Sequence, residues 1–560
     1  MNKEKYLYWL NNKNLDSKLK AELLEMDETA INNAFYTNIE FGTAGMRGIL
    51  GAGTNRINIH TIRKANEGFG NYICNKGQEA KDRGVAIGYD NRHMSYEFAL
   101  DSANYLSGKG IKVYLCKTLT PTPELSFAVR HYNCFGGIMI TASHNPKEYN
   151  GYKLYDETGC QLVPAIADEV IGLVNQVEDP ISLVPNPITD KIILVKEELD
   201  KAYIEKVLTI RLNPDLKSDI KVVFSPEHGA SKHAVEETLL KAGYDLIMVT
   251  EQATADPNFT NTKTPNPEEL EAYTLSLEYA KKHNADLILV CDPDGDRMGV
   301  AVLNNGEYEI LTGNQTGAIL MEYIFSQLKE KKLMPNNPIM FNTIVTSDIG
   351  EKIADYYNVE TEKTLTGFKF IGEKVQTYNL AKSKNYVFGY EESYGSLVAD
   401  FVRDKDATQA CLMLAEACKY YKTKGLTLVD ILNNIYKREG YYVDHQASIT
   451  LAGEEGSIKL KKLIENFRNN PITNLAGHKV SYYEDYGQLI KVKGNDTTKI
   501  TGFTKAEVLK YYLEDGGFVA IRPSGTEPKC KFYYCIRGTN KVEANNSLES
   551  IKEAINAMVL

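Results

Sequence analysis

Residues 136–146 read Gly-Gly-Ile-Met-Ile-Thr-Ala-Ser-His-Asn-Pro. The first five residues are typical of a buried strand, but Asn145-Pro146 cannot continue it, because proline lacks a backbone donor and restricts the residue before it. We therefore expect Ser143 on a sharp loop at a strand end, where sheet proteins place reactive groups. A serine hydroxyl is a poor nucleophile unless other groups hold and activate it.

An acidic loop follows a second strand-like run, residues 285–290, and reads Cys-Asp-Pro-Asp-Gly-Asp-Arg over residues 291–297. Side chains two positions apart on an extended segment face the same way, so the three aspartates can converge on one hard cation. The loop is not an EF-hand, which needs glycine and glutamate where Arg297 and Leu303 stand. An Asx-rich turn without an ion is the alternative, but three crowded carboxylates repel one another unless a cation neutralises them. Mg²⁺ is favoured, because a few carboxylates and a phosphate oxygen suit its chemistry.

A third loop, residues 522–528, reads Arg-Pro-Ser-Gly-Thr-Glu-Pro. Its guanidinium fork, two hydroxyls and glycine-exposed amides match the oxygens of a phosphate monoester. The alternative is an ordinary hairpin turn between the strand-like residues 517–521 and 531–536. No P-loop signature is present, so nucleotide binding has no support in the sequence. Together, a serine loop, an acidic loop and an oxyanion-binding loop indicate phosphoryl transfer.

Two further features are weaker. Glu391 and Ser393 lie two residues apart after a strand-like run, where they could bind vicinal sugar hydroxyls, although an exposed polar loop is an equal alternative. His144 is adjacent to Ser143, which suggests a hydrolase. Neighbours on an extended segment point opposite ways, however, and the G-x-S-x-G elbow is absent. We therefore expect His144 to position the phosphate or substrate.

Composition limits the class of protein. A chain of 560 residues corresponds to about four domains of ordinary size. The formal net charge of −10 argues against nucleic-acid binding but allows a local basic cleft for an anionic small substrate. No signal peptide and no apolar stretch of membrane-spanning length is found. Nine cysteines without Cys-x-x-Cys indicate reduced thiols in a cytoplasmic protein.

Strand-like and helix-like segments alternate along most of the chain, which indicates α/β domains with mixed, mainly parallel sheets. The last part differs, and strand-like residues 447–451, 517–521 and 531–536 with a closing helix at 541–559 predict an α+β domain. The other expected strands are 84–89, 112–116, 136–141, 220–225, 245–250, 286–291, 339–345 and 386–390. The expected helices include 94–107, 197–212, 268–282 and 315–329. The domains are predicted to span 1–205, 206–315, 316–440 and 441–560.

Taken together, these loops resemble those of the α-D-phosphohexomutase family, the phosphoglucomutases and phosphomannomutases. The likeness covers almost the whole chain, with every loop in the order of the family. Residues 42–48 (Gly-Thr-Ala-Gly-Met-Arg-Gly) and 365–369 (Leu-Thr-Gly-Phe-Lys) resemble the longer branch that contains bacterial phosphoglucomutases and phosphopentomutase-like enzymes. The resemblance implies four domains around one central cleft, three related α/β domains and a C-terminal α+β domain.

The resemblance also implies the roles of individual residues. Catalysis falls to Ser143 as the phosphoserine, Lys153 as a candidate general acid/base, Arg47 and His144. One Mg²⁺ would be held by Asp292, Asp294, Asp296 and Ser143. Substrate binding falls to Arg297, Gly367, Phe368, Glu391, Ser393, Lys405, Arg522, Ser524, Gly525 and Thr526.

The function implied is interconversion of glucose 1-phosphate and glucose 6-phosphate, with glucose 1,6-bisphosphate as intermediate and activator. Phosphomannomutase or phosphopentomutase activity is the runner-up, because the Phe368 ring does not itself choose among glucose, mannose and ribose. A metal phosphatase that uses Ser143 would need more metal ligands near the serine. A silent sugar-phosphate sensor would need neither the serine nor the aspartates. We expect sugar phosphates as ligands, no nucleic-acid or membrane partner, and a monomer or homodimer.

Overall fold

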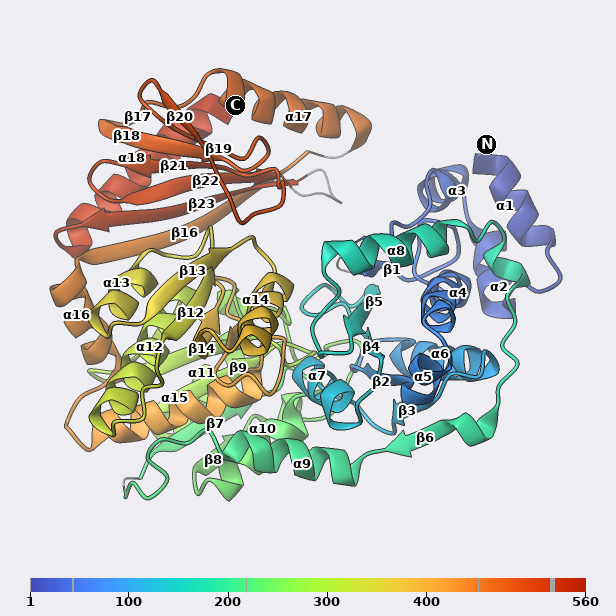
Figure 1. Ribbon diagram of the computed structural model, residues 1–560, viewed down its shortest axis with the longest axis horizontal. Coiled ribbons are helices and arrows are strands. Elements are labelled where there is room, and N and C mark those ends of the chain that lie inside the picture. Colours follow the sequence, from blue (N-terminus) through green and yellow to red (C-terminus); the bar gives the residue numbers. More distant parts are fainter. Residues whose placement is uncertain (1, 43–44, 218, 452, 524–528, 560) are drawn as a thin grey trace. The chain divides into compact units, whose positions relative to one another are not determined.

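The computed structural model describes residues 2–42, 45–217, 219–451, 453–523 and 529–559 (Figure 1). The chain forms two compact units. The first contains residues 1–313 and 368–427, and the second contains residues 314–367 and 428–560. Within the described residues, no helix is both long and apolar enough to cross a membrane.

Three short helices, α1 (Asn2–Asn11), α2 (Ser17–Glu25) and α3 (Glu28–Phe35), begin the first unit. Asp16 and Asp27 cap α2 and α3 by accepting hydrogen bonds from backbone N–H groups of the first turns. The buried ring of Trp9 lies 5.7 Å from the ring of Phe35 and 5.8 Å from that of His60. Because helices of this length are marginal alone, tertiary packing around Trp9 holds them in place.

The first sheet has six strands in the order β1-β5-β4-β2-β3-β6. Strands β2, β3, β4 and β6 are parallel, whereas β5 is antiparallel to both β4 and β1. The strands are β1 (Met46–Ile49), β2 (Val85–Tyr89), β3 (Val113–Cys116), β4 (Gly136–Ile140), β5 (Tyr149–Asp156) and β6 (Ile192–Val195). The accompanying helices are α4 (Ile59–Asn75), α5 (Gln78–Arg83), α6 (Ser95–Gly108), α7 (Thr122–His131) and α8 (Pro164–Asn175). Residues of β2 and β4 are buried throughout, as expected for central parallel strands.

The second sheet has the order β11-β10-β9-β7-β8, in which β7, β8 and β9 are parallel and β10 and β11 return antiparallel. Its strands are β7 (Lys221–Ser225), β8 (Asp245–Met248), β9 (Leu287–Cys291), β10 (Met298–Asn304) and β11 (Glu307–Leu311). Its helices are α9 (Glu197–Leu208), α10 (Lys232–Lys241) and α11 (Thr274–His283). The first unit also holds α14 (Phe368–Ala381), β14 (Asn385–Tyr390), β15 (Ser396–Leu397) and α15 (Ala407–Lys422). Short 3₁₀ turns occur at Pro180–Ser182, Thr189–Lys191, Thr250–Gln252 and Leu270–Tyr273.

The second unit combines a parallel pair of strands with a mainly antiparallel sheet. The pair is β12 (Pro338–Thr343) and β13 (Glu360–Thr364), with helices α12 (Gly313–Glu330), α13 (Ile349–Tyr356) and α16 (Leu428–Glu439). The larger sheet has the order β16-β23-β22-β21-β18-β19-β20, with β17 paired to β18. Its strands are β16 (Tyr441–Thr450), β17 (Asn474–Leu475), β18 (His478–Asp485), β19 (Ile490–Lys493), β20 (Asp496–Lys499), β21 (Leu509–Leu513), β22 (Gly517–Pro523) and β23 (Lys529–Gly538). Helices α17 (Gly453–Asn469) and α18 (Lys541–Val559) complete it.

This architecture confirms the predicted α/β class with a C-terminal α+β part. Two predicted helices are wrong at one end. The helix expected at 268–282 begins only at Thr274, because the Tyr273 hydroxyl donates to the Pro267 carbonyl and the chain between them forms a 3₁₀ turn. The helix expected at 197–212 ends at Leu208, and beyond it the amides of Leu212 and Asn213 donate to the carboxylate of Glu416 instead of continuing the helix.

A buried lysine in the second unit provides a test of this packing. Lys510 on β21 is fully buried. Its ammonium lies 3.7 Å from the centroid of the Phe518 ring and donates no hydrogen bond to any of the described residues. Burial, reinforced by the charge of Lys363, lowers the pKa of Lys510 to about 8. Below that pH the folded state carries a costly buried charge. As pH rises above about 8, the folded state loses the proton before the unfolded state does, and the cost is relieved.

We therefore predict that Lys510→Met stabilises the protein at pH 7 by roughly 1–3 kcal/mol, and that this gain shrinks as pH rises towards 10. Denaturant unfolding of the variant and the wild type across this pH range measures the difference. Lys493→Met, which removes an exposed lysine of the same unit, is the control and should show no such trend. A gain for Lys510→Met that does not change with pH would contradict a charged, buried Lys510.

Candidate active site

The serine loop places Ser143 directly beyond the carboxyl end of β4. Ser143 has a left-handed backbone with φ +52°, which is uncommon for a non-glycine residue. Its amide donates to the Thr141 hydroxyl at 2.8 Å. This turn also brings Ser143 Oγ to 3.2 Å from Nδ1 of His144. The prediction that neighbouring side chains point apart here is therefore wrong, because it assumed an extended backbone.

Arg92 holds the serine loop in this shape, although sequence analysis did not single it out. Its guanidinium is fully buried and donates to the carbonyl oxygens of Ser143 and Asn145, each at 2.5 Å. It also donates to the carbonyl groups of Pro146 and Tyr149. A single planar group with five donors can satisfy a turn whose carbonyls all point inward. The position of Ser143 is thus fixed through the backbone.

The acidic loop after β9 buries the three aspartates that are predicted as metal ligands. Asp292 and Asp294 are fully buried and Asp296 is 2% exposed. One carboxylate oxygen from each of these three residues lies within 4.8 Å of the other two. Asp292 Oδ1 accepts hydrogen bonds from the backbone N–H groups of Asp296 and Arg297, which curls the loop around that oxygen. The loop therefore presents one cluster of hard oxygen ligands.

The serine loop and the acidic loop are in direct contact through their side chains. Ser143 Oγ donates to Asp292 Oδ2 at 2.8 Å. The ammonium of Lys153, on β5, lies 2.8 Å from Asp294 Oδ2 and 3.7 Å from Asp296 Oδ2. The ammonium of Lys405 lies 2.9 Å from Asp296 Oδ2. The predicted nucleophile, the metal ligands and two predicted cationic residues therefore form one connected cluster within the first unit.

The electrostatics of the cluster fit a divalent cation. Burial, followed by the charges of Asp294 and Asp296, raises the pKa of Asp292 well above its usual range. Burial opposes the ionisation of Asp294, but Lys153, a hydrogen bond with Asp292 and the charge of Lys405 together outweigh it and hold the pKa of Asp294 below its usual range. Oδ1 of Asp294 and Oδ1 of Asp296 are buried and accept no hydrogen bond from the described residues. These oxygens are the donor set that a hard cation needs.

Two basic side chains border the cluster. Arg47 on β1 donates through Nη1 to the Asn145 side-chain oxygen at 2.9 Å, so it reaches the serine loop. Arg297 follows the acidic loop and pairs with Glu268 at 2.5 Å. Arg47 therefore places a guanidinium beside the serine loop, and Arg297 places one beside the acidic loop. A phosphate on Ser143 would lie between these two loops.

The loop after β14 carries Glu391, which is 5% exposed, and the half-buried Ser393. Although burial opposes the shift, nearby carboxylates raise the pKa of Arg297 and of Lys405, and Glu391 is among them. Lys405 also lies 5.8 Å from the centroid of the Phe368 ring. Glu391 and Phe368 thus lie near the basic residues that border the acidic loop. The ring of Tyr390, just before Glu391, is buried, and its centroid lies 5.8 Å from that of Phe388.

The remaining predicted site residues belong to the second unit. Gly367 has φ +118° immediately before α14, a conformation that favours glycine. Arg522 is half-buried at the end of β22, where Nη1 lies 3.4 Å from the Tyr533 hydroxyl. The predicted phosphate-binding residues Ser524, Gly525 and Thr526 lie outside the described residues.

Sequence analysis missed Thr122, which is fully buried at the start of α7. Its hydroxyl donates to Asp294 Oδ2 at 3.0 Å and its amide donates to the Asp294 carbonyl at 2.8 Å. Gly229 supports the same loop from the other side, because a Cβ there would lie 2.4 Å from Cα of Pro293. The Thr-Pro-Thr-Pro run at residues 120–123 was the available signal, but nothing in the sequence connects it to a loop about 170 residues away.

Comparisons with known proteins identify the family of the chain. Family models of the phosphoglucomutase/phosphomannomutase α/β/α domains I, II and III match residues 38–180, 201–306 and 312–438, and the C-terminal domain model matches residues 479–545. A phosphoglucomutase of Staphylococcus aureus (strain bovine RF122 / ET3-1) is 36% identical over 557 residues, 98% of each chain.

Two solved structures share the fold. A putative phosphomannomutase from Thermus thermophilus has a TM-score of 0.69 at 21% identity and covers 93% of this chain and 99% of its own. The open form of the Paramecium phosphoprotein pp63/parafusin, a phosphoglucomutase, has a TM-score of 0.67 at 17% identity, over 93% and 95% of the two chains. The fold and site define a phosphosugar-mutase type of enzyme. This chain belongs to the phosphoglucomutase/phosphomannomutase family.

The contact from Thr122 generates a prediction. Thr122→Val removes one donor to a buried carboxylate with little change of shape, and a hydrogen bond to a charged group is worth roughly 1.5–3 kcal/mol. We expect the affinity for a divalent cation to fall by about 10-fold, as measured by titration calorimetry, with the melting temperature little changed.

Thr122→Ser keeps the hydroxyl and should restore the affinity. Thr120→Val is the matched control, because the Thr120 hydroxyl donates to the Thr118 carbonyl instead of to the acidic loop. Equal metal affinity in Thr122→Val and the wild type would show that Thr122 does not position Asp294.

Proposed function

We propose that the protein is a phosphohexomutase that interconverts glucose 1-phosphate and glucose 6-phosphate through a phosphorylated Ser143 and a glucose 1,6-bisphosphate intermediate. The contact of Ser143 Oγ with Asp292 Oδ2 at 2.8 Å carries the proposal. It places the loop serine against the buried carboxylate cluster, where a phosphate on the serine would meet a metal ion. The similarity to phosphoglucomutases over 98% of the chain supports the same reaction.

Asp292, Asp294 and Asp296, together with an oxygen of phosphorylated Ser143, would hold one Mg²⁺, since Mg²⁺ favours few carboxylates and a phosphate. When bound, the ion supplies neutralising charge for the phosphoryl group. The protein supplies the geometry. Arg92 fixes the serine backbone, and the acidic loop is held by Thr122.

The basic side chains have separate tasks in this proposal. Lys153 is the candidate general acid/base, because its ammonium already bridges two of the metal-binding carboxylates and can exchange a proton with the sugar hydroxyl that gains or loses the phosphoryl group. Arg47, Arg297 and Lys405 would neutralise the reacting phosphate, and His144, next to Ser143 Oγ, would position it.

The sugar must be recognised in two orientations, because the bisphosphate has to turn end over end between the two transfers. Glu391 and Ser393 would bind hydroxyls that both orientations present, with Gly367 and Phe368 contributing to the choice of sugar. Arg522 with Ser524, Gly525 and Thr526 would hold the phosphate that is not reacting. Exclusion of water keeps the phosphoserine from hydrolysis, and a cytoplasmic location fits the composition.

The serine assignment can be tested directly. We predict that the purified protein carries one phosphate on Ser143 and that Ser143→Ala loses nearly all mutase activity. Intact mass with peptide mapping locates the phosphate, and a coupled assay for glucose 6-phosphate measures the rate. Ser182→Ala, on an exposed surface segment, is the control. Phosphate mapped to another residue, or full activity in Ser143→Ala, would contradict the assignment of Ser143 as the phosphorylated residue.

Substrate choice is a second prediction. Glu391 and Ser393 are proposed to contact hydroxyls that glucose and mannose share, so they cannot separate epimers at carbon 2. A site that only tolerates an epimer separates the two by roughly 1–3 kcal/mol, or ~10–200-fold. We expect glucose 1-phosphate to be the best substrate, with measurable turnover of mannose 1-phosphate, and Glu391→Ala to lower kcat/KM for both to a similar degree. The highest kcat/KM on ribose 1-phosphate would assign the chain to pentose phosphates instead.

A further inference from the structure

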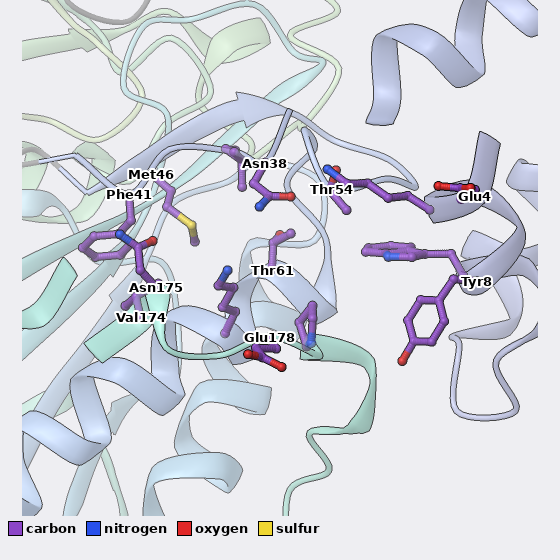
Figure 2. A pocket seen from close by; sticks show the side chains of 15 residues that line it. Glu4, Tyr8, Asn38, Phe41, Met46, Thr54, Thr61, Val174, Asn175 and Glu178 are labelled. Carbon is purple, nitrogen blue, oxygen red and sulfur yellow. The ribbon is translucent and has the colours of Figure 1, made fainter. Parts of the chain in front are cut away.

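A pocket of about 410 Å³ lies between the N-terminal helices and the domain that carries the serine loop (Figure 2). In Figure 2, Glu4 and Tyr8 of α1 form one side, and Phe41, Met46 and Val174 lie on the other. The volume is in the range of small-molecule sites. Helices α1, α2 and α3 precede residue 38, where the match to the family domain model begins. One wall of the pocket is therefore built from a part of this chain that the family model does not cover.

The lining combines an apolar body with cationic side chains, of which Lys5 belongs to α1. Phe41 and Met46 are buried at one end of the pocket, and Trp9 contributes to the α1 wall. Lys64 on α4 also lines the pocket and is half-buried. Among the described residues, no ion pair or hydrogen bond is found for its ammonium. Glu4 and Glu178 reach the same pocket, yet burial lowers the pKa of Lys64 with no carboxylate raising it.

A half-buried ammonium without a countercharge costs free energy that an anionic ligand group would recover. The adjoining aromatic and thioether surface suits the apolar part of the same ligand. The ligand that fits these features is a small organic anion, with a carboxylate or phosphate head beside Lys64 and an apolar body against Phe41 and Met46.

The pocket and the reaction site share one pair of strands. Met46 lies opposite Tyr152 in the β1–β5 register, and Arg47 lies opposite Gly151. The Tyr152 hydroxyl donates to Asn66 of α4 at 2.7 Å, so this residue faces the helix side. The next residue, Lys153, reaches Asp294 on the opposite side. Because successive strand residues face opposite ways, the pocket and the catalytic groups occupy the two faces of β1 and β5.

We propose that this pocket binds a small organic anion through Lys64, and that the bound anion alters the catalytic rate or KM through the strand that carries Met46 and Arg47. The site is separate from the sugar-phosphate site. Its existence does not depend on which hexose phosphate the enzyme converts, and binding can be measured without turnover.

The test uses the full-length enzyme with two probes, 3-phenylpropionate and phenyl phosphate, and the neutral 3-phenylpropanamide for comparison. Titration calorimetry should show saturable binding of at least one anion and binding about 10-fold weaker for the amide, as expected for loss of one charge-assisted contact. The two anions distinguish a carboxylate from a phosphate head. Lys64→Met should weaken binding of the anion by a similar factor, whereas Lys20→Met, which removes an exposed lysine of α2, should not.

Asn175→Trp provides an independent test, because Asn175 is an exposed residue at the edge of the pocket and lies outside the catalytic cluster. The larger side chain should block the anion while the melting temperature and basal activity stay near those of the wild type. Saturating anion should change kcat or KM in the wild type but not in Asn175→Trp. Failure of both anions to bind at millimolar concentrations, equal binding by Lys64→Met or Asn175→Trp, or binding without any kinetic effect would each overturn the proposal.

Discussion

The burial of three carboxylates in one short loop is the constraint on which the first unit depends. Asp292, Asp294 and Asp296 are almost completely removed from water, and unpaired buried charges cost several kcal/mol each. The loop itself offers only backbone amides to Asp292. The other donors come from distant segments, namely the hydroxyls of Ser143 and Thr122 and the ammonium groups of Lys153 and Lys405. Assembly of the site and folding of the first unit are therefore the same process.

Ser143 is positioned through its backbone, whereas the aspartates are positioned through contacts of their side chains. Its left-handed backbone and the inward carbonyls of its loop are stabilised by one buried guanidinium, Arg92, which itself lies 5.3 Å from the centroid of the Phe259 ring. The contact of the Ser143 hydroxyl with a carboxylate is suited to carrying a phosphate next to a metal site. A hydrolytic serine would instead need a histidine that is oriented by a third group. His144 lies close to the hydroxyl, but its proximity follows from the turn.

Much of the fold could be predicted, because its central strands are continuous apolar runs, and β2, β4 and β9 agree with prediction within a residue or so. Family membership could also be predicted, since three loops in one order are far more specific than any one of them. The assigned site residues of the first unit lie around one cluster, while their chemical roles stay predictions. The rest depends on contacts between distant segments. Strand β1 is defined by its pairing with β5, and Thr122 acquires its role only when α7 meets the acidic loop, so no local pattern encodes either.

The pairing of β1 with β5 shows how such long-range contacts connect separate parts of the first unit. Both faces of β5 are buried, with Tyr152 hydrogen-bonded to α4 on one side and Lys153 ion-paired with the acidic loop on the other. A buried strand with both faces packed cannot shift one side chain without its neighbour, because interiors are as dense as organic crystals. Phe41, whose ring centroid lies 6.2 Å from that of Tyr152, lines the pocket on the side opposite α1. The wall of that pocket and the strands that position Arg47 and Lys153 therefore belong to one packed core.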